Sequence, residues 1–227
     1  MNRHEIQNQP AYSPSEAARY LKLPVATLRS WVAGRRYARA GGIARFQPLI
    51  HPPQRKPPLL SFWNLVEAHV LRSLRTEHGV SLKALREALR YAEGRLGIER
   101  LLLREELRTH GGQVFLDRYG ELTNLSASGQ IAIRHMLEEH LARIEWDARR
   151  FPIRLYPFMG RTSSSGNRPI AIDPQISFGR PIVVRAGVTT AVIAERIDAG
   201  ESVQSIAADY ALTEPEIREA VFYERAA

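Results

Sequence analysis

The sequence contains no cysteine, which excludes disulfide bridges, thiolate zinc sites and a cysteine nucleophile. No apolar run approaches the roughly eighteen residues of a membrane-spanning helix, and the N-terminus is polar, without the hydrophobic centre of a secretory signal. These absences predict a cytoplasmic protein with no membrane partner. A hydrophobic fraction of 44% over 227 residues is sufficient for one large or two small globular domains.

Signals for catalysis and metal binding are also scarce. Among seven histidines the nearest pair on a predicted helix is His135 and His140, which are five residues apart and therefore lie on different faces. His69 and His140 fall on apolar stripes and are interpreted as core residues. The run Ser163–Gly166 lacks the strand-to-helix elbow of a nucleophile, and Gly41–Gly42 is a turn and not a phosphate loop. We therefore expect no catalytic residue, metal or cofactor, and a hydrolase is disfavoured.

Positive charge, in contrast, is abundant and concentrated at one end. The chain has a net charge of +8. Residues 1–62 hold ten Lys or Arg against two acids, whereas the rest of the chain holds twenty-two of each. A polyanionic partner would therefore meet the first quarter of the molecule.

A helix-turn-helix pattern coincides with this basic segment. Ser13 is a predicted N-cap, Pro14 occupies the first helical position, and Glu16 completes a capping box. A turn at residues 22–24 leads to a second predicted helix, Val25–Val32, whose inner face is expected to be Leu28, Trp31 and Val32. A helical pair that serves only packing is the alternative, and the charge clustering argues against it.

A β-hairpin wing is predicted to follow, between Gly34 and Ile50. In a winged motif the second helix enters the major groove and the wing lies along phosphates. Arg29 is the candidate for a bidentate contact with guanine. We expect double-stranded DNA to be bound by Thr27, Arg29 and Ser30 on the helix and by Arg35, Arg36, Arg39 and Arg45 on the wing.

The middle of the chain is predicted to be mainly helical. The proline-rich stretch His51–Pro58 is expected to be a stiff spacer. The apolar stripe of the 130–146 helix would serve as a dimer seam or as core. The predicted elements are helices at 62–76, 82–93 (capped by Ser81) and 130–146, a helix or mixed segment at 98–107, a hairpin at 113–123, and, at the end of the region, a strand within 151–158 and a linker at 160–168.

The last unit combines two short strands, Ile170–Ile172 and Ile182–Val184, with three helices that begin near Thr189, Ser202 and Glu214, the last with a capping box at Thr213. The outline is again that of a helix-turn-helix. However, residues 189–225 hold three basic and eight acidic side chains, so this unit would repel phosphate. It is interpreted as a protein-binding or dimerising unit, with a solvated acidic face as the alternative.

Two resemblances to known families support this division. The stretch from Ile170 to Tyr223, with its motifs Ile172-Asp-Pro174, Phe178-Gly-Arg-Pro181 and Gly200-Glu-Ser202, resembles the family called domain of unknown function 433. The N-terminal motifs Ser15-Glu-Ala-Ala18 and Thr27-Leu-Arg-x-Trp31 resemble the winged helix of MerR and excisionase proteins. The first resemblance implies an antitoxin, since members with this layout resemble VapB-type antitoxins that are paired with PIN-domain ribonuclease toxins and repress their own operon.

We therefore expect a mainly α fold with small β-hairpins. It would comprise a DNA-binding winged helix-turn-helix at 1–60, a helical middle at 61–150 and a homeodomain-like C-terminal domain at 169–227. The predicted function is that of a non-enzymatic antitoxin of a type II toxin-antitoxin system, a homodimer that binds operator DNA as an autorepressor and neutralises a PIN-domain toxin. The alternative is a stand-alone regulator of the MerR or excisionase kind. A fragment ending near Phe151 is expected to keep DNA binding.

Overall fold

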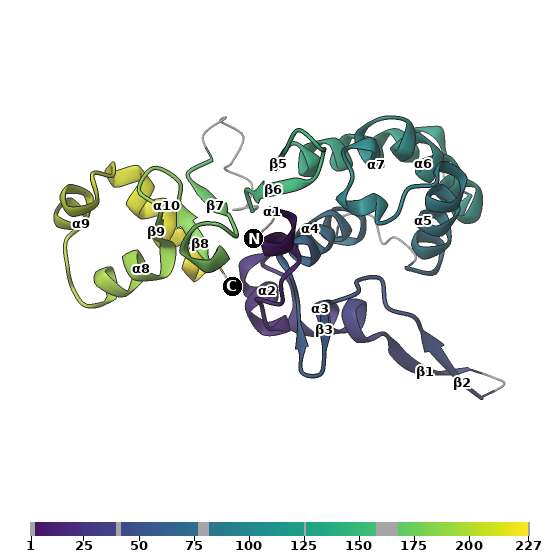
Figure 1. The fold of residues 1–227 in the computed structure, drawn as a ribbon, viewed down its shortest axis with the longest axis horizontal. Helices are drawn as coiled ribbons and strands as arrows, with labels where there is room; N and C mark the ends of the chain where they lie inside the picture. Colours follow the sequence, from purple (N-terminus) through teal and green to yellow (C-terminus); the bar gives the residue numbers. More distant parts are fainter. Residues whose placement is uncertain (1–2, 40–41, 77–81, 125, 158–167, 227) are drawn as a thin grey trace. The chain divides into compact units, whose positions relative to one another are not determined.

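The computed structural model describes residues 3–39, 42–76, 82–124, 126–157 and 168–226. By their contacts the residues group into a first unit, Met1–Val25, Pro53–Phe62 and Ile153–Ala227, and a second unit, Ala26–Pro52 and Trp63–Pro152. Helices predominate and the strands are short, which confirms the predicted mainly α class (Figure 1). No helix within the described ranges is long and apolar enough to cross a membrane. The three functional segments at 1–60, 61–150 and 169–227 stay a prediction.

The first unit begins with helices α1 (Arg3–Asn8) and α2 (Pro14–Tyr20). The predicted capping box is present, because the Ser13 amide donates to Glu16 Oε2 (2.9 Å) and the Glu16 amide donates to Ser13 Oγ (3.2 Å). This reciprocal pair satisfies two amides that the first helical turn cannot bond internally, and it fixes the start of α2.

The proline-rich stretch is a hairpin, so the prediction of a plain spacer was wrong. Strands β3 (Gln54–Arg55) and β4 (Pro58–Leu59) pair antiparallel. The Gln54 side-chain amide donates to the Pro57 carbonyl (3.0 Å), which supports the turn without a proline N–H. Directly after β4, Leu60 exchanges backbone hydrogen bonds with Tyr12 at 2.7 and 2.9 Å, so the hairpin is tied to the start of the chain.

The C-terminal part of the first unit has the predicted form. Strands β6 (Pro152–Leu155), β7 (Ile170–Ile172), β8 (Pro181–Val183) and β9 (Val188–Thr189) pair antiparallel in chain order. Three helices follow near their predicted starts, and their N-caps are Thr189, Ser202 and Thr213, the last as predicted. They are α8 (Thr190–Asp198), α9 (Val203–Tyr210) and α10 (Glu214–Arg225), and their shared core includes Ile170, Val183, Ile193, Ile206, Ile217 and Tyr223.

The second unit holds the wing and the helical middle region. Its wing and long helices are α3 (Val25–Ala33), β1 (Arg35–Arg39), β2 (Gly42–Phe46), α4 (Phe62–Thr76), α5 (Leu82–Leu96), α6 (His110–Thr123) and α7 (Ala127–Leu141). The 98–107 stretch contains two short 3-10 turns, η1 (Leu101–Leu103) and η2 (Glu105–Arg108). On α4 the predicted inner face is buried, including His69, which is 1% exposed. The Ser81 cap and most of the 160–168 linker lie outside the described residues.

The predicted hairpin at 113–123 was wrong, because this stretch belongs to α6. Phe115, Leu116 and Tyr119 are buried along one side of the helix at spacings of helical period. Glycine at 112 permits the close approach of η2, since a Cβ there would lie 2.0 Å from the Leu107 carbonyl oxygen. The Tyr119-Gly120 pair is typical of a turn, but the apolar residues on either side of it have helical spacing, and the helix forms.

The helix expected at 130–146 is α7, which begins earlier and ends earlier. Ser126 caps it by accepting from the Gly129 amide (3.2 Å), and it ends at Leu141. Ile144 lies beyond it on strand β5 (Ile144–Trp146). The stripe residues Ile133, Met136, Leu137 and Leu141 are buried within the chain, which supports the core interpretation of the stripe.

Candidate nucleic-acid interface

Helix α3 presents one buried side and one exposed side, as a recognition helix requires. Leu28 and Trp31 are fully buried and Val32 is 7% exposed, which confirms the predicted inner face. Gly34 ends the helix with φ +72°, a left-handed conformation that suits glycine, and its amide donates to the Ser30 carbonyl (3.1 Å).

The three residues predicted to meet base edges lie away from that buried side. Arg29 is exposed, and Thr27 and Ser30 are half-buried. The Ser30 hydroxyl donates to the Thr27 carbonyl (2.8 Å) within the helix, so its oxygen retains acceptor capacity only. Arg29 is therefore the best placed of the three to donate to a base, while Ser30 can accept from one.

The wing predicted from the sequence is the antiparallel hairpin of β1 and β2. Its register pairs Arg36 with Arg45, so two of the four predicted phosphate contacts lie directly opposite each other. Arg35 pairs with Phe46, and Arg39 pairs with Gly42 next to the turn. The side chains of these four arginines lie outside the described part of the structure.

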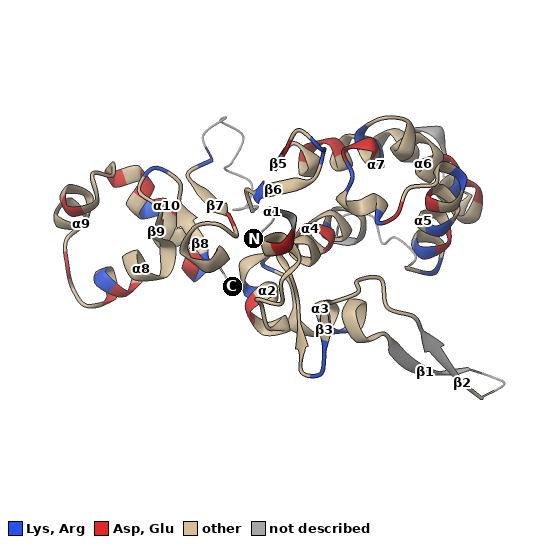
Figure 2. Cartoon of the chain, in the orientation of Figure 1, with Lys and Arg blue, Asp and Glu red and all other residues tan. Residues whose placement is uncertain are grey.

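Charge on the helix and wing is all of one sign. Between Val25 and Phe46 the chain has five arginines and no acidic residue. In contrast, Lys and Arg are interspersed with Asp and Glu on α5 and on α8 to α10 (Figure 2). An acid-free run of arginines on a helix and the adjoining hairpin is the arrangement that attracts a phosphate backbone.

The wing is fixed to α3 at both of its ends. It follows Gly34 directly, and the chain that leaves it returns to the last turn of the helix. There the amides of Leu49 and Ile50 both donate to the Trp31 carbonyl, at 2.8 and 3.1 Å. This double hydrogen bond satisfies a carbonyl that the helix leaves open and holds the segment after the wing in place.

One residue of the basic excess has a different task. Lys22 closes the turn after α2 with φ +52°, and its Nζ lies 4.1 Å from the centre of the Tyr223 ring on α10. Burial lowers the pKa of the Lys22 ammonium. The Tyr223 hydroxyl also donates to the Tyr20 carbonyl (2.7 Å) at the end of α2. No sequence pattern links these residues, and sequence reasoning missed their contact.

A second contact joins the same two parts of the first unit. The Tyr12 hydroxyl, just before α2, donates to the Gly179 carbonyl (3.0 Å). Gly179 has φ +72°, and a Cβ there would lie 2.0 Å from that hydroxyl oxygen, so only glycine fits. Burial raises the pKa of Tyr12, which keeps the hydroxyl protonated as a donor. The C-terminal domain is thus bound directly to α2 and its preceding residue.

The acidic surplus of the C-terminal helices is partly matched within the chain. Arg196 contacts Glu201 and Asp209, with its Nη2 2.6 Å from Asp209 Oδ2. Arg225 pairs with Asp198 at 2.7 Å. The acids still outnumber the bases, so the face keeps a negative charge, and its basic residues are held in ion pairs.

The histidines do not converge on a metal site within the described residues, where no group of three potential ligands is close enough to hold an ion. His140 is 6% exposed, and its Nδ1 donates to the Met136 carbonyl (3.0 Å). His69 Nε2 donates to the His140 carbonyl (3.2 Å). These bonds confirm the interpretation of both as core residues.

Comparisons with known proteins place this architecture in a family. Residues 10–89 match the family described as "Putative DNA-binding HTH domain", and residues 170–223 match "Protein of unknown function (DUF433)". Over 229 residues the chain is 30% identical to the "Putative antitoxin VapB45" of Mycobacterium tuberculosis, with 93% of this chain and 92% of that protein covered. The chain belongs to the VapB45 family.

Two further relatives of this VapB45-family protein come from the same organism. The uncharacterized protein Rv2308 of Mycobacterium tuberculosis is 25% identical, with 95% of this chain and 90% of that protein covered. The crystal structure of Rv2018 from Mycobacterium tuberculosis matches with a TM-score of 0.68 at 25% identity and covers 94% of this chain and 98% of that one. The resemblance to domain of unknown function 433 is confirmed, and the N-terminal resemblance is confirmed as a DNA-binding helix-turn-helix.

Proposed function

We propose that this protein is the antitoxin of a type II toxin-antitoxin system, which binds operator DNA as an autorepressor and neutralises a PIN-domain ribonuclease. The name of the VapB45 relative and the helix-turn-helix match support an antitoxin that binds DNA. The observation that carries the DNA-binding part is the acid-free run of five arginines on α3 and the wing. The protein acts by binding and has no catalytic step of its own.

Within this proposal, α3 reads bases and the wing holds phosphates. Arg29 has the reach and the paired donors to bind the O6 and N7 acceptors of a guanine. Thr27 and Ser30 contact a base or a phosphate. Arg35, Arg36, Arg39 and Arg45 contact the backbone and give affinity without sequence information. A homodimer places two such readers on two half-sites, which is the usual arrangement for this motif.

The toxin is assigned to the C-terminal domain. Its helices carry a net negative charge, which disfavours DNA and favours a ribonuclease with a basic surface. The name of the VapB45 relative supports a toxin as the partner, and residues 189–225 still hold more acidic than basic side chains once their ion pairs are formed.

The first test is the substitution Arg29→Ala. A bidentate contact with guanine contributes about 1–3 kcal/mol of discrimination, so operator affinity should fall by roughly 5- to 150-fold while affinity for random DNA changes little. Arg95→Ala, an exposed arginine at the end of α5, is the matched control and should bind like the wild type. An equal loss on operator and random DNA would show that Arg29 contacts only phosphate.

The wing is tested by its salt dependence. Neutralising Arg35, Arg36 and Arg39 together should weaken binding to every sequence and reduce the log-log salt slope by roughly one for each lost phosphate contact. Fluorescence anisotropy at several salt concentrations measures this slope. If the slope is unchanged, the wing is not part of the interface.

The second candidate function is a stand-alone transcriptional regulator of the MerR or excisionase kind. The bonds from Tyr223 to Tyr20 and from Tyr12 to Gly179 favour it, because they tie the C-terminal domain to α2 of the reader. Co-expression with the product of the neighbouring gene separates the two functions. Stable co-purification of a ribonuclease with this chain supports the antitoxin, and its absence supports the regulator.

A further inference from the structure

The second unit contains a pocket of ≈ 330 Å³ that the proposed DNA and toxin contacts do not use. Its walls come from the segment after β2, from α4 and α5, and from the stretch that leads into η1. A pocket near 300 Å³ is large enough for a small molecule. The apolar part of its lining, called the apolar wall, consists of Pro48, Leu49, Leu89 and Leu102.

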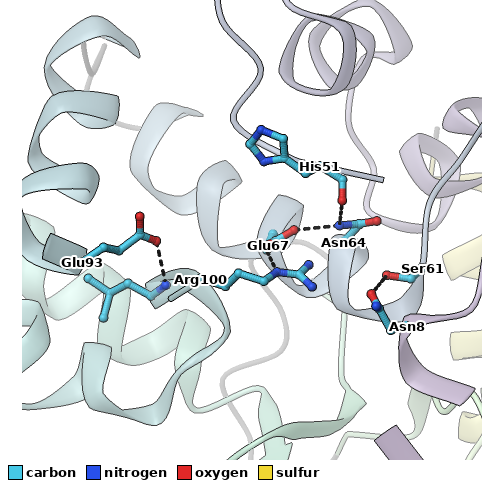
Figure 3. Close-up of polar contacts among 8 residues, drawn as sticks. Asn8, His51, Ser61, Asn64, Glu67, Glu93 and Arg100 are labelled. Carbon is cyan, nitrogen blue, oxygen red and sulfur yellow. Dashed lines mark hydrogen bonds and ion pairs between the residues drawn. The ribbon is translucent and has the colours of Figure 1, made fainter. Parts of the chain in front are cut away.

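The polar floor of the pocket, defined as its lining residues Glu67, Glu93 and Arg100, belongs to an internally matched hydrogen-bond network (Figure 3). Glu67 on α4 is 5% exposed, and its Oε1 accepts from Arg100 Nε (2.9 Å). Its Oε2 accepts from Asn64 Nδ2 (2.8 Å), which also reaches the His51 carbonyl (3.3 Å). Because the charge of Glu67 is already balanced by Arg100, this carboxylate does not make the floor a cation site.

The second carboxylate of the pocket is also engaged. Glu93 Oε1 accepts from the Leu101 amide (3.0 Å), at the start of η1 (Figure 3). Burial raises the pKa of Glu93, against the opposing effects of the Leu101 hydrogen bond and the Arg90 charge, so its carboxyl holds negative charge less readily than an exposed one. Arg100 stands between these two acids in a left-handed backbone conformation, φ +55° and ψ +54°, which is uncommon for a non-glycine residue.

The rim of the pocket is positively charged. Arg90 on α5 is exposed, and among the described residues its recorded interaction is through space with the charge of Glu93, one turn along the helix. Arg86, one turn earlier, donates to the Gln47 carbonyl. With three arginines against two engaged carboxylates, the pocket has an excess of positive charge beside an apolar wall.

From this juxtaposition we propose that the pocket binds a small organic anion, with its acidic group against Arg90 and its apolar body on Leu49, Leu89 and Leu102. The charged and apolar sides of the pocket fit a carboxylate on a compact hydrocarbon better than they fit a bare ion. A charge-assisted hydrogen bond in such a setting supplies orientation as well as affinity.

The pocket also contacts the segment that connects the wing to α3. Leu49, on the apolar wall, is one of the two residues whose amides bond the Trp31 carbonyl at the end of α3. Gln47, which Arg86 holds, directly follows the end of the wing strand β2 at Phe46. A ligand in the pocket therefore touches the segment that fixes α3 to the wing, and its occupancy is expected to change operator affinity.

The test uses 2-naphthoate as the probe and its neutral isostere 2-naphthamide as the matched ligand, with the full chain and no DNA, by isothermal titration calorimetry. Naphthoate should bind saturably with one site per chain, and naphthamide should bind about tenfold more weakly or worse, because it lacks the charge-assisted contact. Arg90→Gln should weaken naphthoate to a similar degree. Arg95→Gln, on the same helix but away from the pocket, should leave it within about twofold.

Three outcomes would overturn the proposal: no saturable binding of naphthoate, equal binding of the acid and the amide, or an Arg90→Gln variant that binds like the wild type. Inorganic phosphate is the competing probe. If it binds as tightly as naphthoate, the apolar wall contributes nothing and the arginines form a phosphate contact for DNA. Because DNA and toxin are absent from these titrations, their result is independent of the proposed antitoxin function.

Discussion

Removal of a single hydroxyl tests whether the C-terminal domain supports the helix-turn-helix. In Tyr223→Phe the aromatic ring remains, so its packing and its contact with Lys22 are preserved. The only loss is the 2.7 Å hydrogen bond to the Tyr20 carbonyl at the end of α2. Tyr223 is 1% exposed, so water cannot easily replace the lost donor. A buried acceptor left without its partner costs about 1–3 kcal/mol, and that range is the expected loss in the free energy of unfolding.

Urea unfolding followed by circular dichroism measures this loss as a lower midpoint at an unchanged slope. The matched control is Tyr91→Phe on α5, because Tyr91 is 45% exposed and its hydroxyl has no hydrogen bond within the described residues. The control should stay within about 0.5 kcal/mol of the wild type. If Tyr223→Phe unfolds at the same urea concentration as the wild type, the hydrogen bond between α10 and α2 does not stabilise the first unit.

Two further predictions concern pH and truncation. Burial lowers the pKa of His140 to about 4 in the folded chain, against an ordinary value of 6.5. As the pH falls, the unfolded chain therefore binds a proton at His140 before the folded chain does. The free energy of unfolding should fall by about 3 kcal/mol between pH 6.5 and pH 4. The variant His140→Gln should lose that part of the pH dependence, whereas His135→Gln, at an exposed position, should keep it. Parallel urea unfolding of both variants at pH 4.5 and pH 7 measures the difference. A fragment ending near Phe151 should bind operator more weakly than the full chain in a gel shift, since Tyr12 and Tyr20 lose their bonds to the C-terminal domain; equal binding would show that the reader is independent.

The elements that the sequence predicted best are those with a local physical signature. The capping boxes at Ser13 and Thr213 are present, and the hydroxyl of each accepts from an amide three residues on. The buried side of α3 follows from the spacing of Leu28, Trp31 and Val32. In each case the interaction that fixes the element lies within one or two helical turns, so a short stretch of sequence contains all of its partners.

The errors occurred where a local signal competed with tertiary packing. Tyr119-Gly120 looks like a turn, yet Gly120 lies inside α6, where a Cβ would come within 2.4 Å of the Gln130 side chain. Proline in the 51–58 stretch excludes a central strand but not an edge hairpin, and β3 and β4 form one. The strength of these competing contacts depends on residues far along the chain, which periodicity does not reveal.

The candidate site was predictable in part for the same reason. Charge clustering and the helix-turn-helix pattern identify α3 and the wing, because both are properties of consecutive residues. The contact between Tyr20 and Tyr223 joins residues 203 positions apart, and the pocket behind the wing is built from four separate stretches. Neither has a sequence signature, because the residues that form each of them come together only in the folded chain.

The two helix-turn-helix-like parts of this chain share an outline but differ in charge. Helices α2 and α10 begin in the same way, with a capping box and a proline in the first turn. Yet the helix and wing that follow α2 have arginines and no acid, whereas residues 189–225 have eight acids, and all three of their basic side chains are held in ion pairs. A phosphate backbone that approached residues 189–225 would meet surplus carboxylates, and every basic side chain of that stretch is already in an ion pair. Likeness of fold alone would suggest DNA for both, whereas the electrostatics supports the proposal of DNA for the first and a protein partner for the second.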